Sequence, residues 1–127
     1  MKYYYKDPYG QYYNTYSISE LPLNKPIWGF AYSINDDTED KRLICLPVQG
    51  EISENINRNY KIWSKYCFIP YKKGTNTKRK SGVVDFNSRM YADAYEEAVE
   101  MFNELVQQRI DNLYQMAEKA KADMIKG

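Results

Sequence analysis

The sequence contains no histidine, and this absence removes much of the usual chemistry of enzymes. Histidine is the commonest general base, the partner of Ser and Cys nucleophiles and a frequent metal ligand. Only two cysteines occur, Cys45 and Cys67, and two thiols do not complete a zinc site. Catalysis by carboxylates or tyrosines stays open, but we expect no catalytic residue, no metal and no cofactor.

The sequence also has no long apolar run and only a small net charge. No stretch approaches the roughly 20 apolar residues that cross a bilayer, and the segment MKYYYKDPYG has no apolar core of a secretory signal. We therefore expect a cytosolic protein without membrane contact, whose two cysteines are free thiols. The 18 basic and 17 acidic residues nearly cancel, which argues against nucleic acid as a partner.

The chain is short and has no linker rich in proline or glycine, so its 127 residues predict one domain, 1–127. Strand patterns fill residues 1–90 and a helical pattern fills 91–127. The predicted class is α+β: an antiparallel sheet of about five or six strands followed by one long or two C-terminal helices.

Several segments carry the signals of strands and tight turns. The tyrosine-rich N-terminus turns at KDPYG and predicts a hairpin, and IWGFAYSI (Ile27–Ile34) predicts a second hairpin with RLICLPV. Small Gly29 and Ala31 alternate with large residues in IWGFAYSI, so one strand face packs and the other lies close to another group. Pro47 predicts a bend or an edge. The run Tyr60–Tyr71 and GVVDF complete the sheet.

After Met90 the pattern becomes helical. Asp93 and Glu96 have the spacing of a capping box, and no glycine or proline follows before Ile125. An unbroken helix would be roughly 45 to 50 Å long, so it either breaks near Asn112 or projects. A projecting apolar stripe would need a second chain to cover it, which predicts a homo-oligomer, most simply a dimer. Two shorter helices over one sheet are the alternative. The stripe consists of Tyr95, Val99, Phe102, Val106, Ile110, Leu113, Ala117, Ala120 and Met124.

A cluster of cations marks the first candidate binding site. Five cations and no acid lie between positions 72 and 80, around a GTNT turn, and such a loop can neutralise phosphates. The alternative is a solvated hairpin tip that keeps a sheet edge soluble. We take Lys78 and Arg79 as candidate ligand contacts.

The segment behind this loop supplies further parts of a nucleotide pocket. Phe86 offers a ring for stacking a base, Asn87 an amide that pairs with an adenine edge, and Arg89 a guanidinium; Tyr91 follows. The structural alternative makes Phe86 a core residue and Asn87 a turn former.

A last candidate lies near the apolar stripe of the helix. Arg109 falls about 50° from the centre of the stripe. It can contact the ligand, extend to solvent, or pair with a carboxylate such as Asp85. No phosphate loop, dinucleotide fingerprint or nucleophile elbow is present, and the acidic segment from Asp36 to Asp40 is interpreted as a solvated turn.

The tyrosine-rich sheet segment that ends in VVDFNSRMYADAYEEAVEMFNELVQQRI resembles the phage-encoded Thoeris anti-defence sponge proteins. The resemblance implies an antiparallel sheet with two helices, oligomeric assembly, and sequestration of a cyclic ADP-ribose signal made by bacterial TIR-domain enzymes. It places the family's stacking aromatic on Phe86 and its helix arginine on Arg109, with Asn87 and Arg89 as polar partners. Leu113 stands where the family has a second helix arginine.

The leading hypothesis is therefore a non-enzymatic protein that traps a small cyclic nucleotide in the cytoplasm of an infected bacterial host and so blocks antiviral signalling. The alternative is a phage protein that inhibits a host defence macromolecule, such as a CRISPR effector, through exposed tyrosines and the long helix. A binder of single-stranded nucleic acid is a third, weaker alternative, because the net charge is close to zero.

Overall fold

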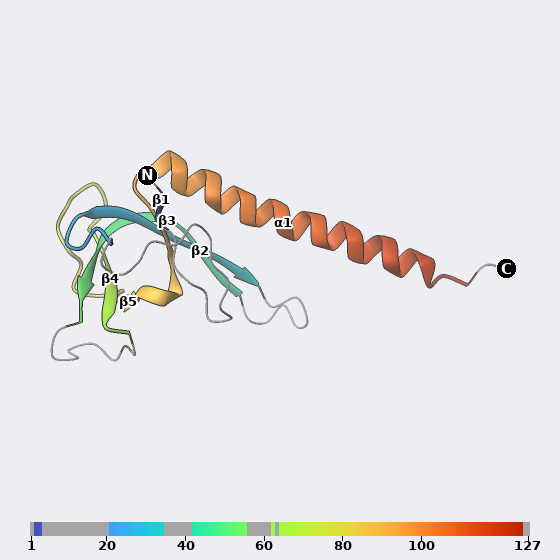
Figure 1. The fold of residues 1–127 in the computed structure, drawn as a ribbon, viewed down its shortest axis with the longest axis horizontal. Coiled ribbons are helices and arrows are strands. Elements are labelled where there is room, and N and C mark those ends of the chain that lie inside the picture. Colours follow the sequence, from blue (N-terminus) through green and yellow to red (C-terminus); the bar gives the residue numbers. More distant parts are fainter. Residues whose placement is uncertain (1, 4–20, 35–41, 56–61, 63, 126–127) are drawn as a thin grey trace.

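The computed structural model describes residues 2–3, 21–34, 42–55, 62 and 64–125. They form a six-stranded antiparallel sheet and one long helix (Figure 1). The spatial order of the strands is β1-β6-β2-β3-β4-β5, and a short 3-10 helix, η3, separates β5 from β6. The predicted α+β class, with a sheet followed by one long helix, is confirmed. The elements are β1 (Lys2–Tyr3), β2 (Pro26–Ile34), β3 (Arg42–Glu54), β4 (Tyr66–Pro70), β5 (Val84–Asp85), η3 (Phe86–Ser88), β6 (Met90–Ala92) and α1 (Tyr95–Ala122).

The central pair of the sheet is the hairpin that the sequence predicts. β2 and β3 pair antiparallel, and the register shifts where Gly29 lies opposite Val48 while Ala31 lies opposite Cys45. This shift gives β3 one extra residue, and Pro47 sits in it, because a bulge tolerates a residue without an N–H donor. Pro47, for which the sequence predicts a bend or an edge, thus lies at a register shift within β3. The turn at 35–41, with its acidic segment, and most of the N-terminal hairpin lie outside the described residues.

Two predicted strands have other limits. β4 begins only at Tyr66, so Ile62, Ser64 and Lys65 are not strand residues; 60, 61 and 63 are not described. GVVDF is not the last strand, because β6 follows it and pairs between β1 and β2. The sheet therefore ends at Ala92, not at residue 90. The sequence does not reveal β6, because over only three residues the alternation of a strand looks the same as the first turn of a helical pattern.

Each face of the sheet carries a buried apolar cluster of its own. Alternation along β6 shows this directly: Met90 and Ala92 pack on one face, and Tyr91 between them packs on the other. On the first face α1 covers Phe30 with Ala98 and Met101. The second face has no helix and packs side chains from β2, β3, β4, η3 and β6. Its buried members are Ile27, Ile52, Tyr66, Phe68, Phe86 and Tyr91.

Helix α1 is unbroken for 28 residues and extends beyond the sheet (Figure 1). Its first turns pack on β2, β3 and β6, and its C-terminal half projects (Figure 1). Of the two predicted alternatives, a break near Asn112 and a projecting helix, the structure has the projecting helix. The predicted capping box is also wrong, because the N-cap is Ala94 and no side chain caps the helix. Glu96 and Glu97 in the first turn instead complement the positive end of the helix dipole.

Gly29 on β2 and Gly50 on β3 show which side chain lies close to the strand face that carries small residues. The ring of Phe68 rests against both glycines, and a Cβ built on either one would come within 2.8 Å of Phe68 Cζ. On Gly50 the added carbon would also overlap the carbonyl oxygen of Ile69, which is backbone and cannot turn aside. The absence of a side chain at these positions allows the ring to fill the core.

We expect Gly50→Ala to lower the free energy of unfolding by about 1 to 3 kcal/mol, the usual cost of forcing extra volume into a packed core. Urea unfolding followed by circular dichroism measures it. Ser81→Ala, at an exposed loop position, serves as the control and should change stability by less than about 0.5 kcal/mol. Equal stability of Gly50→Ala and the parent protein would contradict the packing described.

Candidate ligand-binding site

The predicted stacking aromatic, Phe86, is a core residue. Its side chain is 7% exposed, and its ring lies parallel to that of Tyr91, with centroids 5.1 Å apart and an angle of 3° between the planes. Tyr66 meets Phe86 edge-on. Tyr91 is itself 1% exposed and donates a hydrogen bond from its hydroxyl to the carbonyl oxygen of Phe86. The ring face that a base would need is already occupied by Tyr91.

The neighbouring polar residues shape the chain locally. The Asn87 N–H donates to Asp85 Oδ1 over 2.8 Å, and the Ser64 N–H donates to Asp85 Oδ2 over 3.0 Å. The guanidinium of Arg89 donates to the carbonyl and the hydroxyl of Ser88. Asp85 acts as the cap of η3. Asn87 therefore has the structural role of a turn residue. Its side chain is nevertheless exposed.

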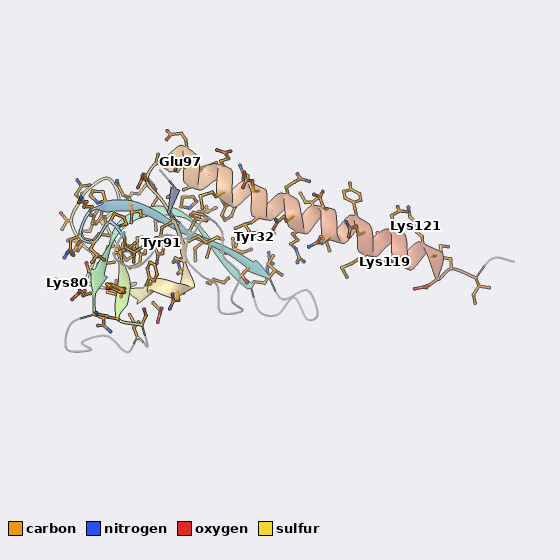
Figure 2. The ribbon with its side chains drawn as sticks, in the orientation of Figure 1. Tyr32, Lys80, Tyr91, Glu97, Lys119 and Lys121 are labelled. Carbon is orange, nitrogen blue, oxygen red and sulfur yellow. The ribbon has the colours of Figure 1, made fainter. Side chains whose placement is uncertain are left out.

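Phe86 and Arg109 lie on opposite faces of the sheet within one chain. Phe86 belongs to the cluster on the face without a helix, whereas α1, which carries Arg109, packs on the other face. Figure 2 shows Tyr91, the stacking partner of Phe86, inside the sheet region and away from the projecting helix. The sandwich predicted between Phe86 and Arg109 is therefore not formed in a single chain. The reason is the alternation of β6, which sends Tyr91 to the face opposite the helix.

The basic loop is a closed hairpin with defined geometry. Tyr71 and Lys78 form an antiparallel bridge, and the Arg79 N–H donates to the carbonyl of Pro70. Inside the loop, the Lys72 N–H donates to the carbonyl of Thr77, and the Thr75 hydroxyl donates to the carbonyl of Lys72. Gly74 has φ +75°, a conformation that a residue without a side chain adopts at little cost. The backbone bonds hold the turn, and the cationic side chains extend from it.

A buried carboxylate anchors both ends of this loop. Glu51 on β3 is 7% exposed and accepts a hydrogen bond from the Tyr71 hydroxyl at 2.8 Å. Its other oxygen lies 2.9 Å from the ammonium of Lys78, whose side chain is half exposed, and accepts from the Ser53 hydroxyl at 3.3 Å. Lys78, a predicted ligand contact, is therefore engaged with the protein. A buried carboxylate needs such partners because desolvation penalises its charge.

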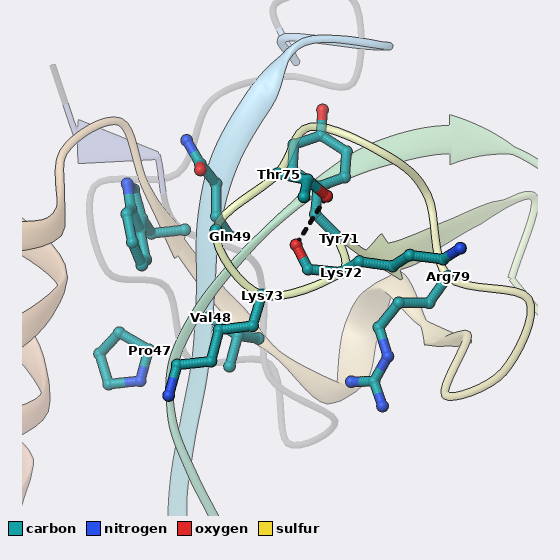
Figure 3. Close-up of a pocket in the computed structure, with 10 residues that line it drawn as sticks. Pro47, Val48, Gln49, Tyr71, Lys72, Lys73, Thr75 and Arg79 are labelled. Carbon is teal, nitrogen blue, oxygen red and sulfur yellow. Dashed lines mark hydrogen bonds between the residues drawn. The ribbon is translucent and has the colours of Figure 1, made fainter.

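A hollow of about 720 Å³ lies between this loop and the hairpin of β2 and β3 (Figure 3). Trp28 and Gln49 are paired across the two strands, so both side chains lie on one face of the sheet. This is the helix face, because Trp28 packs edge-on against Tyr95 at the start of α1. The volume falls in the range of pockets that take small molecules. The lining consists of Trp28, Pro47, Val48, Gln49, Tyr71, Lys72, Lys73, Gly74, Thr75 and Arg79.

The lining combines aromatic and apolar surface with three cations and no acid. Figure 3 shows that the side chain of Lys73 runs toward Pro47, while those of Lys72 and Arg79 lie on the opposite side. All three are exposed. Positive charge therefore borders the hollow on two sides. An anionic ligand with a flat ring has partners of both kinds there.

Of the seven predicted site residues, only Arg79 lines the hollow. Sequence reasoning missed Trp28, Gln49 and Tyr71, because their proximity depends on the register of β3 with both β2 and β4. The cluster of five cations without an acid was the one available signal, and it identified the loop. The anchor at Glu51 had no signal, since one acidic residue in a strand is typical of a solvated face.

The described residues contain no group of three or more His, Cys, Asp or Glu side chains placed to bind a metal. In the same part of the chain, no helix combines the length and the apolar character that crossing a membrane requires. Comparison with known protein families, curated proteins and solved structures found no match. The resemblance to anti-defence sponge proteins therefore stays a prediction.

The bond from Tyr71 to Glu51 predicts a loss of stability at high pH. Burial, with added effects of the hydrogen bond and the negative charge of Glu51, raises the pKa of Tyr71 from 10.0 to about 12. The fold thus favours the neutral phenol: its contribution is complete below pH 10 and is lost as pH rises toward 12. Between these values the parent protein should lose more free energy of unfolding than Tyr71→Phe.

Urea unfolding at a series of pH values, recorded for both proteins, checks this expectation. The comparison isolates Tyr71, because all other tyrosines and lysines titrate in both. Parallel stability curves from pH 8 to 12 would show that Tyr71 does not carry the effect.

Proposed function

We propose that the protein is a non-enzymatic binding protein for a small ligand that carries both an aromatic ring and phosphate groups. The observation that supports this is the composition of the hollow: Trp28 and Tyr71 beside Lys72, Lys73 and Arg79, without an acidic lining residue. Cations favour phosphate oxygens, and the indole of Trp28, half buried against Tyr95, offers aromatic surface to a base. This position replaces the predicted pocket at Phe86.

The specific form of the proposal is sequestration of a cyclic ADP-ribose signal. Such a molecule has a purine and a diphosphate, which are the two groups that the hollow suits. Binding without turnover agrees with a lining that contains no histidine and no carboxylate to act as a general base. The cytoplasm of an infected bacterial host is the location that this function implies.

Titration calorimetry with cyclic ADP-ribose isomers tests the proposal, with ADP and inorganic phosphate as comparison ligands. We expect a purine diphosphate to bind more tightly than phosphate alone, because the aromatic surface adds to the ionic contacts. Heat release followed by mass spectrometry should then recover the ligand unchanged. Recovery of a hydrolysed product would indicate an enzyme, and no binding of any isomer would remove the sequestration function.

Paired loop variants locate the site. Lys73→Ala should weaken binding of the tightest ligand by about ten- to a hundredfold, since a bond to a charged group contributes about 1.5 to 3 kcal/mol. Lys80→Ala is the matched control: Lys80 is an exposed cation of the same segment, lies at the outer side of the sheet region (Figure 2) and does not line the hollow. Equal losses in both variants would indicate a nonspecific effect of charge and would contradict the site.

A further inference from the structure

The hollow beside the basic loop is lined by one amide side chain, that of Gln49 on β3. Gln49 is half buried, and its amide makes no hydrogen bond to any residue that the structure describes. Only its backbone carbonyl is engaged, since it accepts from the Tyr71 N–H over 2.9 Å. Polar groups withdrawn from water normally have a hydrogen-bond partner. The amide of Gln49 therefore keeps both its acceptor and its donors for a molecule that enters the hollow.

Gln49 lies between two aromatic residues in a row that crosses the sheet. Trp28 on β2 is directly opposite Gln49 on one side. Tyr71 is opposite it on the other side, because the register that joins Gly50 with Pro70 continues for one more residue. Neighbours in such a row have their side chains on one face, on strands about 4.8 Å apart. A flat base that stacks on the half-buried indole of Trp28 therefore turns an edge toward the amide of Gln49.

The other polar side chains of the lining are either engaged or can only donate. The Thr75 hydroxyl donates to the carbonyl of Lys72 (Figure 3) and accepts from the N–H two residues further on. The Tyr71 hydroxyl donates to buried Glu51. Lysine, arginine and the indole of tryptophan have N–H donors and no acceptor. Among the described lining side chains, the amide oxygen of Gln49 is thus the acceptor that is not already engaged.

We infer that Gln49 makes the hollow selective for adenine over purines that carry an oxygen at position 6. This inference rests on the proposed function and names the residue that recognises the base. Adenine presents the N6 amino group, a donor, beside the acceptor N7, and a glutamine amide offers the complementary pair. Guanine and hypoxanthine present two acceptors, O6 and N7, which leave the oxygen of Gln49 without a donor. Gln49 thus takes the role that the sequence predicts for the amide of Asn87.

The cations of the hollow have a different task from that of Gln49. Lys72, Lys73 and Arg79 border the hollow and suit the phosphate groups of the ligand. Every nucleoside diphosphate carries the same phosphates, so these contacts add affinity without distinguishing one base from another. The base is distinguished by the groups at its edge. Loss of a cation should therefore weaken all purine nucleotides alike, whereas loss of the Gln49 amide should change their relative affinities.

Titration calorimetry with ADP and IDP tests this role, because the two nucleotides have the same charge and sugar and differ at position 6 of the purine. The parent protein should bind ADP about five- to a hundredfold more tightly than IDP, the usual discrimination by one bidentate amide contact. Gln49→Met removes the amide at similar side-chain length and should bring the ratio of the two dissociation constants close to one. Gln49→Lys should reverse the preference, since an ammonium donates to both O6 and N7.

Two further variants serve as controls. Asn87→Leu removes an amide from an exposed position on η3, outside the hollow, and should leave the ratio of the dissociation constants unchanged. Lys73→Ala should weaken ADP and IDP by the same factor, so that their ratio stays that of the parent protein. Urea unfolding followed by circular dichroism verifies that each variant is folded. Gln49→Met should unfold at the same urea concentration as the parent, because the amide has no partner among the described residues.

The outcomes separate this inference from the proposed function. Equal affinity of the parent protein for ADP and IDP would overturn the role of Gln49 and leave the binding function intact. A preference for ADP that persists in both Gln49→Met and Gln49→Lys would overturn that role as well, because other groups would then recognise the base. If neither ADP, IDP nor any cyclic ADP-ribose isomer binds, the proposed function fails, and the inference fails with it.

Discussion

A single buried carboxylate, that of Glu51, connects the sheet to the only part of the described chain where cations gather without acids. It binds Tyr71 at the start of the basic loop and Lys78 near its end. Two bonds to one residue fix both ends of the turn, so that Lys72, Lys73 and Arg79 extend from a defined position beside β2 and β3. If the loop moved away, the carboxylate of Glu51 would stay buried without partners, which costs more free energy than either bond contributes. The position of the loop is therefore coupled to the stability of the fold.

The sheet has apolar clusters on both faces, and this determines where a ligand can bind. The face without a helix is filled by aromatic rings, with Phe68 over two glycines and Phe86 stacked on Tyr91. The helix face is covered by α1 only in part, which leaves Trp28 accessible between Tyr95 and the basic loop. The hollow thus lies on the helix face of the sheet, between the start of α1 and the basic loop.

Helix α1 is continuous, but its first half packs on the sheet and its second half is exposed. Its sequence has no helix breaker, so the backbone continues after the sheet has ended. The apolar period also continues, and its residues pass from half-buried Phe102 and Val106 to exposed Ile110 and Leu113. The acidic first turn and the two lysines of the last turn complement the dipole at both ends. The exposed half therefore has residues that favour a helix, although it packs on no core within the chain.

The sequence by itself determined the class of fold, the β2–β3 hairpin, the helical C-terminus and the cationic loop. Each of these follows from neighbours in the chain: alternation, turn residues, helical period and local charge. The tertiary structure decided which face each side chain occupies. It placed Phe86 opposite the helix that carries Arg109, and it brought Trp28 to Lys73 and Glu51 to Lys78. These contacts join strands whose register depends on packing across the whole sheet, and a shift of one residue would send every side chain to the other face.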